Sequence, residues 1–146
     1  NSHLTIPTIQ TPHNEWIAFD AQPFLAAISQ GVDFIMFGHL RYESIATEPA
    51  SISPFFHSFA KNRGFTGLTI TDDMGMLENS GMDPIETMRQ AFDAGNDILL
   101  YVTSKASPQD LFREALLYAT SSSTIYSSFQ QQYNHIKIFK EEKLTN

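Results

Sequence analysis

Hydrophobic and polar positions follow two alternating patterns along this chain. Three short apolar or β-branched runs, at residues 33–38, 67–71 and 97–102, have the composition of strands buried on both faces. The stretches between and after them carry apolar residues three or four positions apart, which is typical of amphipathic helices. Strand and helix therefore alternate three times, and this order predicts parallel strands joined by right-handed crossovers.

Residues with known capping preferences mark where the helices begin and end. The predicted limits are Asp20 to Gly31, Ser53 to Gly64, Asp83 to Gly95 and Ser107 to Ala119. Residues 1–15 contain Pro7 and Pro12 and are predicted to be irregular. Residues 121–146 are predicted to form the terminal helix, with apolar residues recurring every three or four positions.

Three parallel strands fit two architectures. One is a small doubly wound sheet, and the other is one segment of a (β/α)8 barrel. A complete barrel needs about 250 residues, whereas this chain has 146. Any barrel here would therefore be partial, and the hydrophobic pattern alone leaves both architectures open.

Composition and charge exclude several classes of function. The formal charge of -7 argues against a nucleic-acid-binding surface, which would be basic. No run of 18 apolar residues is present to predict a membrane span, and the absence of cysteine excludes disulfides and thiolate metal sites. The sequence begins at Asn1 instead of methionine, so we expect that a preceding segment has been removed.

Candidate chemistry lies where the predicted strands end, because function gathers at the carboxyl ends of parallel strands. The first strand ends at His39 and the second at the pair Asp72-Asp73. A carboxylate in this place can act as a nucleophile, a general base or a metal ligand. The same pair can equally cap the turn, so the two carboxylates alone do not identify a catalytic site.

A larger set of motifs occurs in a fixed order around this pair. They are Asn1-Ser2-His3-Leu4-Thr5-Ile6-Pro7, the run DFIMFGH at 33–39, PASISP at 49–54, GFTGLTITDDMGM at 64–76 and AGNDILL at 94–100. Together they resemble the β-N-acetylglucosaminidase (β-hexosaminidase) branch of glycoside hydrolase family 3, over nearly the whole chain. The resemblance implies an α/β fold: the C-terminal segment of a (β/α)8 barrel, with three parallel strands alternating with helices. Residues 1–146 would then be a single partial domain, in which residues 1–15 are the remnant of a catalytic loop.

The resemblance also assigns roles to individual residues. Asp72 matches the catalytic nucleophile of the family, and His3 matches its general acid/base. Asn1 occupies the position of an aspartate that orients this histidine in the family, so it is a supporting residue without the negative charge. His39 matches a position in or beside the sugar pocket and is expected to bind substrate. No metal or organic cofactor is expected.

The function implied is retaining hydrolysis of terminal β-linked N-acetylglucosamine, with peptidoglycan fragments as the substrate. In the family, other sugar-binding residues, including a Lys-His pair and an Arg, come from earlier strands that this chain lacks. Three strands would also leave an open sheet edge and exposed apolar flanks. We therefore expect the partner to be either the missing half of the barrel or a second copy of the chain.

Two other functions are compatible with parts of the sequence. A truncated or degenerate homologue would act as a non-catalytic binding or scaffold module, as Asn1 and the missing strands suggest. A phosphoacceptor domain of the doubly wound type also uses an acidic pair, with a lysine after a later strand, and Lys105 follows the third strand here. This last reading leaves the other motifs unexplained.

Overall fold

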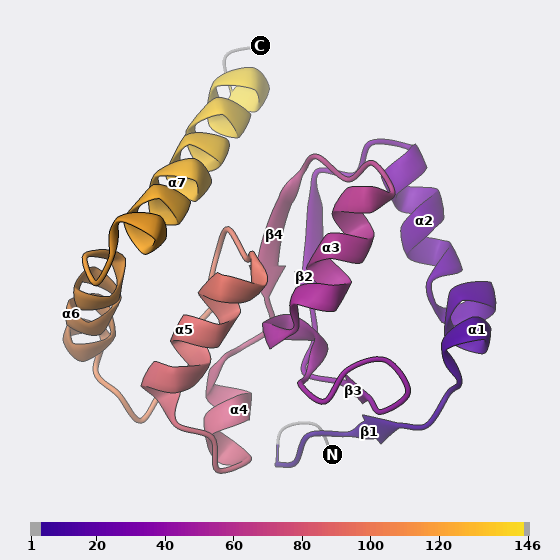
Figure 1. Cartoon of the computed structure of the whole chain (residues 1–146), viewed down its shortest axis with the longest axis horizontal. Coiled ribbons are helices and arrows are strands. Elements are labelled where there is room, and N and C mark those ends of the chain that lie inside the picture. Colours follow the sequence, from indigo (N-terminus) through magenta and orange to yellow (C-terminus); the bar gives the residue numbers. More distant parts are fainter. Residues whose placement is uncertain (1–3, 145–146) are drawn as a thin grey trace.

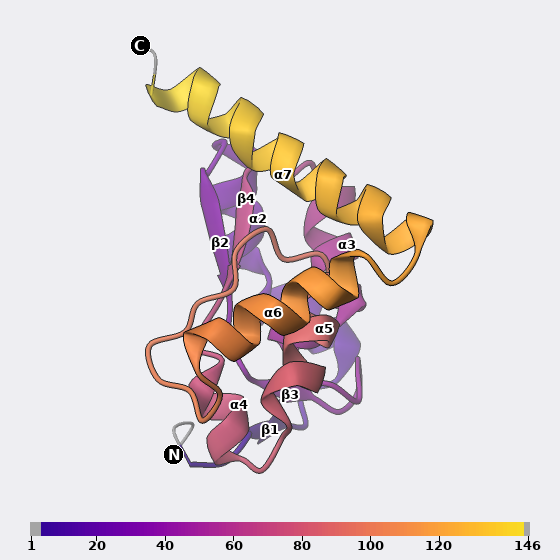
Figure 2. The same ribbon diagram turned by 90° about the vertical axis from the view of Figure 1, so that its left-hand side faces the viewer.

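The computed structural model describes residues 4–144, in which helices flank two central parallel strands. In chain order the elements are β1 (Thr8–Ile9), α1 (His13–Glu15), η1 (Trp16–Asp20), α2 (Gln22–Ser29), β2 (Phe34–Phe37), β3 (Arg41–Tyr42), η2 (Ala50–Ile52), α3 (Pro54–Asn62), β4 (Leu68–Thr71), α4 (Gly75–Asn79), α5 (Pro84–Ala94), α6 (Pro108–Ala119) and α7 (Ser123–Leu144). Figure 1 shows β2 and β4 in the middle of the molecule, with α1 and α2 on one side and α6 and α7 on the other. In Figure 2, α6 and α7 form the layer nearest the viewer.

The central strands pair as the sequence predicts. β2 and β4 are parallel and in register from Phe34 opposite Leu68 to Phe37 opposite Thr71, and α3 lies between them in the chain. A second, smaller parallel pair joins β1 to β3, with Thr8 opposite Arg41. The prediction that residues 1–15 are irregular is therefore wrong for β1. Only a partner more than thirty residues away makes this segment a strand, and local sequence does not show such a partner.

The third predicted strand, over residues 97–102, is reduced to a single parallel bridge between Ile70 and Ile98. The segment still runs beside β4, but side chains replace part of the backbone ladder. The Thr71 hydroxyl accepts the N–H of Leu100 at 2.9 Å, and the Asp97 carboxylate accepts the N–H of Thr69 at 2.8 Å. The prediction of three regular strands is thus corrected to two strands and one irregular parallel segment.

Helix limits agree with most of the predicted capping residues and differ at the first helix, while Ser53 stands at the N-cap position of α3 without a capping bond from its side chain. Asp83 caps α5, and Gly95 ends it with a left-handed backbone at φ 107° that glycine adopts without strain. Asp20 caps nothing, because the chain is already helical from His13 and passes through the wide π-helical turn of η1. The Ala21 N–H bonds back to the Trp16 carbonyl at 2.9 Å, so no free helix end exists at Asp20.

The cap at Asp83 provides a stability test. Its Oδ1 accepts the N–H groups of Ile85 at 3.0 Å and Glu86 at 2.9 Å. Replacing Asp83 by alanine leaves both donors without this partner and is expected to lower the free energy of unfolding by about 1 kcal/mol. Asp83→Asn retains the accepting oxygen and is the matched control. Urea unfolding of both variants measures the difference, and equal stability of the two would show that the cap contributes nothing.

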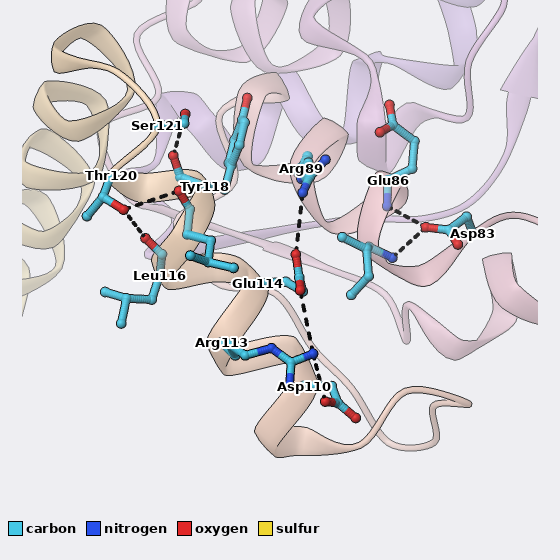
Figure 3. A network of polar contacts seen from close by, with 12 residues as sticks. Asp83, Glu86, Arg89, Asp110, Arg113, Glu114, Leu116, Tyr118, Thr120 and Ser121 are labelled. Atoms are coloured by element: carbon cyan, nitrogen blue, oxygen red, sulfur yellow. Dashed lines mark hydrogen bonds and ion pairs between the residues drawn. The ribbon is translucent and has the colours of Figure 1, made fainter.

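Helices α5 and α6 are joined by a network of polar contacts drawn in Figure 3. Arg89 of α5 reaches Glu114 of α6 at 3.5 Å, and Glu114 also lies 3.6 Å from Arg113. Such partly exposed pairs contribute little individually. The stacking of Phe92 on Phe129, with ring centroids 3.7 Å apart, buries apolar surface between α5 and α7 and is the stronger contact.

The core lies in three groups of buried side chains around the central strands. Trp16 and Phe56 anchor the first, Ile35 and Phe65 the second, and Met74 the third. Met74 follows directly after the acidic pair and is fully buried against Ile52, Leu77 and Ala91. The turn that carries Asp72 and Asp73 is therefore fixed by the close packing of Met74 in the core. Within residues 4–144, no helix combines the length and apolarity that a membrane span requires.

Candidate active site

Asp72 is the first residue after β4, at the carboxyl end of the central strands. Its N–H donates to the Phe37 carbonyl at 3.0 Å, which continues the pairing of β2 with β4 by one more bond. Its Oδ1 accepts the N–H of Asp73 at 2.8 Å, and the side chain is partly exposed. The carboxylate is thus fixed by its own turn and open to solvent at the end of the sheet where the sequence predicts the site.

Asp73 has a structural role. Its Oδ1 accepts the N–H of Gly75 at 3.1 Å, at the start of α4, and the N–H of Val102 at 2.9 Å. The second bond ties the segment after residue 97 to the turn that carries Asp72. A carboxylate engaged in this way is committed to holding backbone and is poorly placed to act as a nucleophile.

His39 lies beside this turn but is buried, with 4% of its surface exposed. Its Nε2 lies 2.9 Å from the Asp73 carbonyl, and its Nδ1 lies 2.6 Å from the hydroxyl of Ser51. Both ring nitrogens are therefore occupied by groups of the protein itself. The structure brings His39 to the candidate nucleophile, and direct contact between its ring and a substrate stays a prediction.

Burial lowers the pKa of His39 below its usual value of about 6.5, although the Asp73 carbonyl and the carboxylates of Asp72 and Asp73 act in the opposite direction. Burial likewise lowers the pKa of His57, which is 2% exposed and stacks on Phe37 with ring centroids 4.1 Å apart. Both histidines are consequently neutral in the folded protein near pH 7.

A pH dependence of stability follows from these two histidines. In the unfolded chain both histidines bind protons below about pH 6.5, whereas in the folded chain they become protonated only at a lower pH. Their contribution to stability is therefore complete above about pH 6.5 and is lost as the pH falls toward the folded-state values. The free energy of unfolding should drop by up to about 1.4 kcal/mol per pH unit for each histidine. Urea unfolding from pH 7 to pH 5 measures the slope, which His57→Gln should reduce; an unchanged slope would contradict this assignment.

Two residues that the resemblance assigns to catalysis, His3 and Asn1, lie outside the described residues. Their roles as acid/base and supporting residue stay predictions. Leu4 and Thr5 begin the described chain, and it then runs into β1, which pairs with β3 just beyond His39 in the sequence.

The buried polar residues Ser51, Asn96 and Glu78 had no role in the sequence-based interpretation. Ser51 and Asn96 are almost fully buried and hydrogen-bonded to each other, with the Asn96 Nδ2 donating to the Ser51 carbonyl at 2.8 Å. Glu78 in α4 is 1% exposed and accepts the Ser104 hydroxyl at 2.5 Å and the Lys105 N–H at 2.6 Å. Ser51 and Asn96 fall inside the quoted motifs, so their order in the sequence could have identified them, whereas nothing local distinguishes Glu78.

The phosphoacceptor interpretation finds no support in the position of Lys105. Its Nζ donates to the Glu78 carbonyl at 2.7 Å, at the far end of α4 from the acidic pair. Among residues 4–144, no group of three or more His, Asp or Glu side chains is arranged to hold a metal ion.

Comparison with protein families decides where the chain belongs. The family described as "Glycosyl hydrolase family 3 N terminal domain" matches residues 1–136. This chain belongs to glycosyl hydrolase family 3. The family accounts for the ordered motifs around Asp72 and for the parallel strands that carry it.

One curated relative and two solved structures show how far the similarity extends. A β-hexosaminidase of Xylella fastidiosa is 36% identical over 103 residues, which is 68% of this chain and 31% of the relative. A family 3 β-N-acetylglucosaminidase structure from Paenibacillus sp. superposes on 97% of this chain with a TM-score of 0.82 and 23% identity, covering 28% of that chain. A β-glucoside phosphorylase superposes equally well, with a TM-score of 0.81, 19% identity, and coverage of 96% of this chain and 27% of its own.

These comparisons establish the fold and the family but not the reaction of this chain. The chain spans less than a third of the length of the curated relatives it matches first. The backbone also fits a phosphorylase as well as a glucosaminidase.

Proposed function

We propose that this chain supplies the nucleophile of a retaining glycoside hydrolase that removes terminal β-linked N-acetylglucosamine. The observation that carries the proposal is the geometry of Asp72 at the end of β4. Its carboxylate is held in the turn and partly exposed, while the adjacent Asp73 is occupied by two backbone N–H groups. The family assignment and the named function of the curated relatives support the same reaction.

The chemistry follows from the oxygen of Asp72 that is left free to attack. Because Oδ1 accepts the Asp73 N–H, we assign Oδ2 to the attack on the anomeric carbon. A bond forms between Oδ2 and this carbon as the glycosidic C–O bond breaks, giving a glycosyl-enzyme ester. Water then attacks the same carbon and releases the carboxylate, so that two inversions give net retention. The negative charge of Asp72 also stabilises the oxocarbenium-like transition state.

The proton transfers are assigned to His3. In the first step an imidazolium protonates the departing glycosidic oxygen, and in the second the neutral ring removes a proton from water. Asn1 can hydrogen-bond such a ring but supplies no charge to it. We assign N-acetylglucosamine-containing peptidoglycan fragments as the substrate class, on the resemblance to the glucosaminidase branch.

The open edge of β2 indicates what the site needs to be complete. Among the described residues β2 pairs with β4 alone, and Phe34 and Met36 are 48% and 51% exposed. An apolar groove of about 140 Å³ lies beside this edge, lined by Phe24 and Ile28 of α2 and by Phe59 of α3 among others. We propose that the remaining strands of a family 3 barrel cover this surface and supply the other sugar contacts.

Light scattering on the purified 146-residue chain tests this partner. An exposed apolar edge predicts association or poor solubility of the chain alone. Addition of a polypeptide with the preceding barrel strands should give a one-to-one complex. A stable complex between two copies that excludes the added strands would instead identify a second copy as the partner.

A chromogenic β-N-acetylglucosaminide tests the reaction. Hydrolysis with the β-anomer as the first product, observed by ¹H NMR before mutarotation, is the expected result. An α-anomer would contradict the double displacement. No turnover at any pH, with the barrel complete, would favour the non-catalytic scaffold, to which Asn1 in place of an aspartate also points.

A further inference from the structure

The two hydrogen bonds of His39 determine where its proton lies. A carbonyl oxygen only accepts, so the Nε2 that faces the Asp73 carbonyl at 2.9 Å carries the hydrogen. In the neutral ring Nδ1 is then an acceptor, and the Ser51 hydroxyl at 2.6 Å must be its donor. The protein therefore selects the Nε2–H tautomer of His39.

Ser51 is itself fixed in the orientation that this bond requires. It is fully buried, its N–H donates to the Gly38 carbonyl at 3.1 Å, and its own carbonyl accepts from Asn96 at 2.8 Å. The same Asn96 Nδ2 donates to the Ala91 carbonyl of α5 at 2.7 Å. Both hydrogens of the amide are used, so the end of α5 is tied to the loop that holds His39.

These hydrogen bonds continue from His39 to Asp73. The Asp73 carbonyl accepts the Nε2–H of His39, and its carboxylate accepts the N–H groups of Gly75 and Val102. The Asp73 N–H donates to the carboxylate of Asp72. Asp73, which donates to the Asp72 carboxylate, is thus fixed at its carbonyl, its side chain and its N–H. Any change in the tautomer of His39 would release the first of these contacts.

We propose that Ser51 and Asn96 are positioning residues, which fix the Nε2–H tautomer of His39 and through it the orientation of the Asp72 carboxylate. The four residues come from four separate segments, since Ser51 lies in η2, Asn96 follows α5, His39 follows β2 and Asp72 follows β4. This inference deepens the proposed function and rests on it for its catalytic meaning, but the tautomer itself is measurable without any turnover.

The test is ¹⁵N NMR of the chain labelled at its histidines. The wild-type chain at pH 7 should show His39 as the Nε2–H tautomer. Ser51→Ala removes the donor to Nδ1 and should raise the population of the other tautomer about tenfold, the effect of one hydrogen bond. Asn96→Ala should shift the same resonances in the same direction by less. Ser51→Cys, which keeps a weak donor, should give a population between those of serine and alanine.

Ser53→Ala is the matched control. Ser53 is equally buried and two residues away, but its side chain does not cap α3, and the two ring nitrogens of His39 bond to Ser51 and Asp73 instead. It should leave the His39 resonances unchanged. A wild-type His39 that is charged or in the Nδ1–H form, or a Ser51→Ala spectrum identical to wild type at His39, would overturn the proposal. If Ser51→Ala does not fold, Ser51→Cys decides in the same way.

Kinetics separate this inference from the proposed function. In a chain that hydrolyses the chromogenic substrate, Ser51→Ala should lower kcat about tenfold with KM nearly unchanged, because the change affects the attacking group more than the sugar contacts. The expected NMR response without hydrolysis by the completed barrel would refute the function and leave the positioning of residue 73 intact. Unchanged kcat with an altered tautomer would refute the link to Asp72.

Discussion

Replacing Asp72 by asparagine is expected to lower hydrolysis of a β-N-acetylglucosaminide by at least about a thousandfold, since the covalent step is lost with the nucleophile. The amide keeps the oxygen that accepts the Asp73 N–H, so the turn should survive. The attacking oxygen is replaced by an NH₂ group, which cannot form the glycosyl ester. Steady-state kinetics of the two proteins on the chromogenic substrate measure the loss.

Asp73→Asn is the matched control for this experiment. The two N–H groups that bond to Asp73 both reach Oδ1, which asparagine retains. This variant should keep most of the activity. A third variant, Asp72→Ala, should lose activity and regain turnover when azide is added, because azide can enter the vacated space and attack the anomeric carbon directly. Equal losses of activity for Asp72→Asn and Asp73→Asn would contradict the assignment of Asp72 as nucleophile and Asp73 as a structural residue.

Replacing Gly75 by alanine is expected to be the most damaging single change to the stability of the site. A Cβ at Gly75 would lie 2.1 Å from the Thr103 carbonyl oxygen and 2.8 Å from its hydroxyl oxygen. The nearer atom belongs to the backbone, and its segment is held against the turn by the bond from Val102 to Asp73. Neither side can move without breaking contacts, so we expect a loss of roughly 3 kcal/mol in the free energy of unfolding.

Gly38→Ala is the control, because a Cβ there meets no atom within 4 Å. It makes the same chemical change on the neighbouring strand end and should alter stability far less. Urea unfolding of both variants gives the comparison. Similar stabilities would show that the loop at Thr103 yields easily, and that close packing at Gly75 does not hold the turn.

The alternation of strands and helices could be predicted because it depends on local patterns. Asp83, with Pro84 after it, begins α5 by capping chemistry that operates within a few residues, and Gly95 ends it in the same way. The irregular segment after Asp97 could not be predicted. Its apolar composition suits a strand, but the hydroxyls of Thr69 and Thr71 on the facing strand accept the N–H groups of Asp97 and Leu100. That outcome depends on which side chains meet across the sheet.

The position of Asp72 at a strand end could likewise be predicted, and the structure places it there. The buried residues behind it could not, because their roles arise from contacts far apart in sequence. Ser51 and Asn96 are separated by 45 positions, and each is an ordinary polar residue until the fold buries it. Glu78 shows the same effect, since only the return of the chain at Ser104 explains a buried carboxylate in α4.

The most direct test of Asp72 as the nucleophile is to trap the covalent intermediate on this chain in its completed barrel. A 5-fluoro-β-N-acetylglucosaminyl fluoride slows both steps through its ring fluorine but keeps a good leaving group, so the glycosyl-enzyme accumulates. Tryptic digestion then gives the peptide of residues 64–89, and fragmentation locates the added sugar. A sugar ester on Asp72 alone is the expected result. An ester on Asp73 or Glu78, or turnover of the reagent without any adduct, would contradict it.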